Sequence, residues 1–90
     1  MASTEVDKDT ALAALSLIDK MIQEQRNRVI ARAKQVRPGL TDDEIPRLRE
    51  LPDVCADAAW RLEDEQLARL MAAKLMLKAK LFEDQQSGFA

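Results

Sequence analysis

Apolar residues in the first part of the chain recur at spacings of three, four or seven. The series runs from Leu12 to Val36 through Leu15, Ile18, Ile22, Val29 and Ala33. Because an α-helix has about 3.6 residues per turn, these positions share one helical face. Pro38 and Gly39 then disfavour continuation of the helix. We therefore predict a long helix over about residues 9–36, preceded by a flexible N-terminal arm over residues 1–8.

A short connecting segment follows. Thr41 and Glu44 have the spacing of a capping box, but Pro46 lacks the amide proton that a helix starting at Asp42 needs. With Asp43 as the cap, Pro46 falls in the first turn, where no proton is required. The pattern therefore predicts a short helix over about residues 43–51. Its apolar face consists of Ile45, Leu48 and Leu51.

The last part of the chain carries two neighbouring apolar stripes at helical spacing. Pro52 could be the first residue of this helix, and Asp57 is a second possible cap. We predict a helix over about residues 54–84 and a flexible tail over residues 85–90. One stripe contains Ala59, Leu62, Gln66, Leu70, Ala73, Leu77 and Leu81, and the other contains Trp60, Leu67, Met71, Leu75, Ala79 and Phe82. Together they form an apolar arc wider than one neighbouring helix can cover.

These elements predict an all-α fold, with a single helical domain over residues 9–84. Two long helices joined by a short connecting helix are expected to fold back as an antiparallel hairpin. The chain can cover one stripe itself, and the second favours association, as a homodimer that forms a four-helix bundle or with a different protein. The predicted interface is Trp60, Leu67, Met71, Leu75 and Phe82. The alternative is a monomer in which the connecting helix covers everything.

Composition narrows the function classes. The 90 residues include no His and a single Cys, and the net charge is −2. A nucleophilic Cys55 would lack a base, and no catalytic, metal-binding or cofactor-binding motif is present. The lone Cys and the acidic start, without an apolar signal core, favour a cytoplasmic protein, and no apolar run is long enough for a membrane span. We therefore expect a non-enzymatic interaction module, such as an adaptor, a small chaperone or an assembly subunit.

Polar residues on or beside the apolar stripes suggest an alternative. Gln25, Arg32 and Gln66 could turn into the centre of the bundle. If they met in an enclosed polar pocket, the protein would bind a small ligand or act as an enzyme. The direction of these three side chains therefore discriminates between the two hypotheses.

A basic cluster late in the first helix is the remaining candidate site. It contains Arg26, Arg28, Arg32 and Arg37, with Lys34 among them. It could contact an anionic partner, and Arg28 and Arg32 could bind nucleic acid. The cluster lacks aromatic residues on which bases stack, and the chain is acidic overall. A solvated helix face is therefore the favoured interpretation, and nucleic acid is an unlikely partner.

Overall fold

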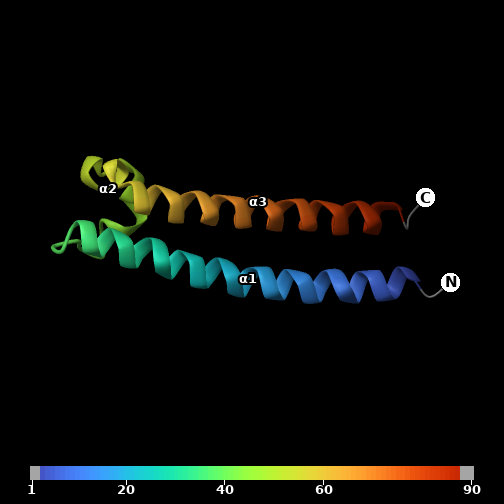
Figure 1. Cartoon of the computed structure of the whole chain (residues 1–90). Helices are drawn as coiled ribbons and strands as arrows, with labels where there is room; N and C mark the ends of the chain where they lie inside the picture. Colours follow the sequence, from blue (N-terminus) through green and yellow to red (C-terminus); the bar gives the residue numbers. More distant parts are fainter. Residues whose placement is uncertain (1–2, 88–90) are drawn as a thin grey trace.

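The computed structural model describes the backbone of residues 3–87 and the side chains of residues 9–81. This part of the chain is all-helical and contains no strand. The elements are α1 (Ser3–Val36), the 3₁₀ helix η1 (Ile45–Glu50), α2 (Pro52–Ala56) and α3 (Ala58–Ser87). Figure 1 shows α1 and α3 side by side and running in opposite directions, with η1 and α2 at one end and both termini at the other. The molecule measures 56 × 22 × 20 Å.

Helix α1 is longer than its apolar pattern predicts. It begins at Ser3, so the backbone of the expected arm is helical from that residue onward. No Pro or Gly lies in the arm to interrupt the helix. At the other end the helix stops where expected, because Pro38 follows immediately. The amide of Arg37 donates the last helical bond to the carbonyl oxygen of Ala33, at 2.8 Å.

The connecting segment forms a 3₁₀ helix in place of the predicted α-helix over residues 43–51. Arg47, inside η1, has non-helical dihedral angles of φ −118° and ψ 27°, and Leu51 is extended at φ −92° and ψ 111°. Pro52 explains where the segment ends, because it disfavours α-helical geometry at Leu51. Pro46 lies in the first turn of η1, where no amide proton is needed.

Thr41 and Glu44 interact as their spacing predicts, but they close a turn instead of capping an α-helix. The Glu44 Oε1 atom accepts bonds from the Thr41 amide at 3.0 Å and from its hydroxyl at 3.1 Å. The amide of Glu44 donates to the Thr41 carbonyl oxygen at 3.0 Å. This turn leads into η1.

The predicted last helix is divided in two. Helix α2 begins at Pro52, and α3 begins at Ala58 after an extended Asp57 with φ −77° and ψ 119°. Asp57 caps α3, because its Oδ2 atom accepts the amide of Trp60 at 2.8 Å. Of the two candidate starts, Pro52 therefore begins α2, and Asp57 caps α3. Helix α3 continues to Ser87, past the expected end at residue 84.

The hydrophobic core lies at the end of the molecule that holds the connecting segment. Its buried members are Ile22, Val29, Ala33, Leu48, Val54, Trp60 and Leu67. Ile22 on α1 and Leu67 on α3 are the buried members nearest the termini. We call residues 22–67 the loop half, and residues 9–21 with residues 68–81 the terminal half.

Candidate interaction surface

The terminal half contains no fully buried side chain among residues 9–21 and 68–81. Its inward-facing residues, such as Leu15, Ile18, Leu70 and Leu77, are only half-buried. Its large exposed apolar side chains are Leu12 (50% exposed), Leu17 (60%), Met21 (42%), Met71 (41%), Leu75 (67%) and Met76 (75%). In the loop half, Leu62 is the corresponding large exposed apolar residue, at 61%.

The contrast between the halves has a simple geometric cause. In the loop half, η1 and α2 form a third layer over the contact between α1 and α3, so Trp60 and Val54 are closed off from water. In the terminal half only two helices are in contact. A residue between two helices remains open to water on both sides of their line of contact, which we call the seam. Burial requires neighbours around most of the side chain.

The predicted interface residues lie partly in the core and partly on the surface. Trp60 and Leu67 are only 3% and 7% exposed and belong to the chain's own core, which corrects the expectation that this stripe stays uncovered. Met71 and Leu75 lie on the surface, and the side chain of Phe82 lies outside the described residues. The reason is the connecting segment. Leu48 of η1 and Val54 of α2 belong to the same buried cluster as Trp60 and thereby take it out of solvent.

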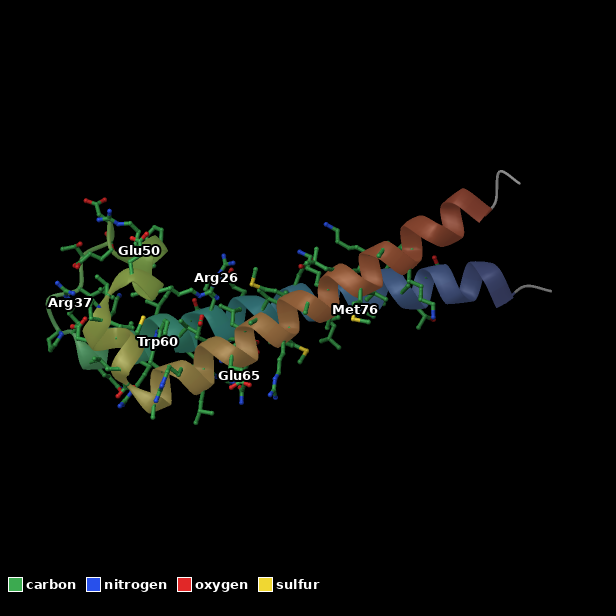
Figure 2. All side chains as sticks on the ribbon, turned by 90° about the horizontal axis from the view of Figure 1, so that it is seen from above. Arg26, Arg37, Glu50, Trp60, Glu65 and Met76 are labelled. Carbon is green, nitrogen blue, oxygen red and sulfur yellow. The ribbon has the colours of Figure 1, made fainter. Side chains whose placement is uncertain are left out.

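Helices α1 and α3 together present two long faces, and the connecting segment covers only one of them. The connector face holds a groove of about 400 Å³ where Ile45 and Pro46 of η1 lie over Ile30, Trp60 and Leu67. The opposite face has shallow grooves lined by α1 and α3 alone, and we call it the bare face. Its grooves are lined by Met21, Glu24, Gln25, Arg28, Gln66, Arg69 and Leu70, and nearer the loop by Arg28, Ala31, Arg32, Gln35, Ala59, Leu62 and Glu63. Figure 2 shows Arg26 and Glu50 on the connector face and Glu65 on the other side.

The three polar residues proposed for a central pocket do not share an enclosed site: Gln25 and Gln66 line one shallow groove, and Arg32 lines another nearer the loop. Gln25 is buried and donates from Nε2 to the Glu63 carbonyl oxygen at 2.8 Å and to Glu63 Oε2 at 3.1 Å. Arg32 binds Asp57, and Gln66 is exposed. Two of these residues therefore join α1 to α3, and the arrangement favours a structural role over a ligand-binding one.

The Arg32–Asp57 pair fixes the start of α3. Arg32 donates from Nε to Asp57 Oδ2 at 2.8 Å and from Nη2 to Oδ1 at 2.9 Å. This two-point hydrogen bond, together with the bond from the Trp60 amide, lowers the pKa of Asp57 to about 2. The same hydrogen bond raises the pKa of Arg32. A charged Asp57 thus caps α3 and ties it to α1 at the same time.

The predicted basic patch does not form one surface. Arg37 pairs with Glu44 at 3.2 Å and with Asp53 at 3.4 Å, as Arg32 pairs with Asp57. Arg26 lines the groove on the connector face, whereas Arg28 lies on the bare face. Half of the four arginines therefore neutralise the chain's own acids, and the other two point to opposite sides.

Further polar contacts join the connecting segment to α3 and its own parts to one another. Arg49 of η1 binds Asp64 of α3 at 3.1 Å, which raises the arginine pKa. The Cys55 thiol donates to the Arg49 carbonyl oxygen at 3.1 Å. Bonds from the Thr41 amide and hydroxyl lower the pKa of Glu44. The Arg49–Asp64 pair thus joins η1 to α3, and the Cys55 bond joins α2 to η1, which gives Cys55 a structural role.

Sequence reasoning missed the exposed apolar residues of α1. Leu17 and Met21 lie one helical turn apart, beside the stripe that contains Ile18 and Ile22. That spacing was the available signal that α1, like α3, has an apolar surface wider than one seam. Both helices thus contribute to the candidate surface.

The described residues contain no cluster of three or more His, Cys, Asp or Glu side chains suited to a metal ion. None of the described helices has an apolar stretch long enough to cross a bilayer. No protein-family model, no curated protein and no solved structure matches this chain.

Proposed function

We propose that this protein is a small non-enzymatic protein–protein interaction module whose helical hairpin self-associates into a four-helix bundle. The observation that carries the proposal is the end of the core at Ile22 and Leu67. Beyond these residues, Leu and Met side chains continue along both helices, but none of those within residues 9–21 and 68–81 becomes buried. The roles that fit such a module are those of an adaptor, a small chaperone or an assembly subunit.

The free energy available from the terminal half supports association. Complete burial of one Leu-sized side chain contributes roughly 1.5–3 kcal/mol. Leu17 and Met21 are each at least two-fifths exposed, and Leu70 and Leu77 of α3 are half-buried. Burial of several such side chains offsets an association cost put at roughly 4–15 kcal/mol when they pack well. The two helices of a second copy cover the open contact between α1 and α3. A closed two-fold dimer is the commonest symmetric assembly.

Sedimentation equilibrium across a micromolar concentration series tests the proposal. We expect the mass to rise from that of one 10.1 kDa chain to twice that value, and the thermal midpoint to rise with concentration. Circular dichroism of the same samples controls for folding. A helical protein that sediments as a single 10.1 kDa species throughout contradicts the self-association.

A further inference from the structure

The bare face is the side on which a second hairpin can lie along the whole molecule. On the connector face, Ile45 and Pro46 of η1 already occupy the loop half. On the bare face, the grooves are lined only by α1 and α3. Figure 2 shows the connecting segment displaced to the side of Arg26 and Glu50, away from Glu65. A partner on the bare face therefore meets no obstacle at the loop end.

The apolar part of the bare face lies in the terminal half. Met21 and Leu70 line one groove, and helical spacing continues the surface to Leu17, Ala73 and Leu77. In the loop half, the same face is occupied largely by the Gln25–Glu63 and Arg32–Asp57 contacts, with Leu62 exposed among them. Two bare faces thus bury the most apolar surface when their terminal halves overlap.

Charge separates the two helices in the terminal half. Between residues 9 and 21, α1 carries Asp9 and Asp19 against one base, Lys20. Between residues 69 and 80, α3 carries Arg69, Lys74, Lys78 and Lys80 and no acid. Within one chain, Asp19 already pairs with Lys74 across the seam. Because each chain carries both signs on separate helices, a second copy offers the complementary charge to each helix.

From these observations, and resting on the proposed function, we infer that two copies dock through their bare faces with both connecting segments at the same end. A two-fold axis parallel to the helices then places α1 of each chain beside α3 of its partner, so the basic part of α3 meets the slightly acidic terminal part of α1. The opposite arrangement, with terminal halves overlapping and connecting segments at opposite ends, places α1 beside α1 and α3 beside α3. The bases of α3, Arg69, Lys74, Lys78 and Lys80, would then lie beside those of the second copy.

Single-cysteine chains distinguish the two arrangements. In a Cys55→Ser background, one chain carries Leu17→Cys and the other carries Ala73→Cys. Both positions are exposed, and the Asp19–Lys74 pair places them at similar heights along the hairpin. After the two chains are mixed and treated with a short bifunctional thiol reagent, we expect the mixed dimer to dominate. Neighbouring helices in a bundle lie about 8–10 Å apart, within reach of such a reagent.

Each other outcome has a definite meaning. If cross-links join Leu17→Cys to itself and Ala73→Cys to itself, the chains point in opposite directions. That result, or a dimer without mixed cross-links, overturns the arrangement but leaves the self-association standing. If the unmodified protein sediments as a monomer, both the arrangement and the proposed function fail.

Glutamate substitutions on the two faces test the choice of face. Met21→Glu lies on the bare face, and Met71→Glu lies one turn beyond Leu67 toward the connector face. The two methionines are 42% and 41% exposed, so both variants should keep the monomer fold, which circular dichroism checks. We expect Met21→Glu to weaken dimerisation at least roughly tenfold and Met71→Glu to change it less than about twofold. The reverse order would place the contact on the connector face and overturn the inference.

Discussion

The loop half and the terminal half use the same two helices and similar residue types, but only one of them has a core. Ile22, Val29 and Leu67 are at most 9% exposed, whereas Leu17 and Leu75, on the same two helices, are 60% and 67% exposed. The difference lies in the third layer that η1 and α2 add over the loop half. Hydrophobicity alone therefore does not bury a residue between α1 and α3, because the contact between two helices needs cover from at least one further element.

The comparison also shows how the two halves use polar groups. In the loop half, Gln25 and Asp57 satisfy backbone groups on α3, and arginines neutralise nearby acids. In the terminal half, the Asp19–Lys74 pair joins the helices, and the other charges lie on the surface. The packing of the loop half is thus determined by contacts within the chain, while the terminal half leaves both apolar side chains and charges exposed.

Truncation of Trp60 should produce the largest difference in stability between the loop half and the terminal half. We expect Trp60→Ala to destabilise the protein by about 3–5 kcal/mol, because it removes the largest side chain of the core and leaves a cavity. The matched control is Met76→Ala in the terminal half, where the side chain is 75% exposed and the change should stay within about 0.5 kcal/mol. Urea unfolding followed by circular dichroism measures both. Equal losses for the two variants would show that the halves do not differ as described.

Removal of the Gln25 amide should have the next largest effect. Gln25→Ala removes the bonds from the buried amide to the Glu63 carbonyl oxygen and to Glu63 Oε2 and leaves a cavity, at a cost of about 1–3 kcal/mol. Gln23→Ala is the control, because Gln23 is exposed and bonds only to Asn27 on the surface of the same helix. Urea midpoints compare the two variants. If Gln25→Ala is as mild as the control, the buried contact does not join the helices as strongly as its geometry suggests.

Amide hydrogen exchange should separate the halves directly. At low protein concentration, we expect amides at residues 9–21 and 68–81 to exchange at least about tenfold faster than those of residues 22–36 and 58–67. Helices with few buried contacts open more readily. The gap should narrow when the concentration rises and the dimer forms. Equal protection of both halves in the dilute monomer would contradict the picture of an incomplete core.

Lowering the pH should produce the smallest of these changes in stability, through Asp57 at the N-terminus of α3. Since the pKa of Asp57 is lowered to about 2 in the folded protein, its contribution to stability is present above the ordinary value of 3.8 and is lost as the pH falls through about 2. Asp57→Asn keeps a capping side chain but removes the charge, so its stability should change less with pH in this window. Asp42→Asn, at an exposed turn position, is the control and should retain the wild-type pH dependence. Urea midpoints between pH 2 and pH 5, about the range over which such a carboxylate titrates, measure the difference. Parallel curves for wild type and Asp57→Asn would show that the Arg32 contact adds no stability.

The all-helical class and the end of the first helix could be predicted from the sequence. Spacings of three, four and seven residues from Leu12 to Val36 describe one helical face, and Pro38 ends the helix for a local steric reason. Asp57 was recognised as a possible cap for the same kind of reason. Such signals lie within a few neighbouring residues, where backbone chemistry decides the outcome.

Other features required the tertiary structure. Periodicity placed Trp60 and Leu62 on neighbouring stripes of one helix, but it could not say which of them would be covered. The break at Asp57 and the 3₁₀ geometry of η1 direct the connecting segment over Trp60, which leaves Leu62 exposed. The sequence by itself determined which residues are apolar and which of them share a helical face, because those properties are local. Which apolar residues became core was decided only by packing, since burial depends on neighbours that are distant along the chain.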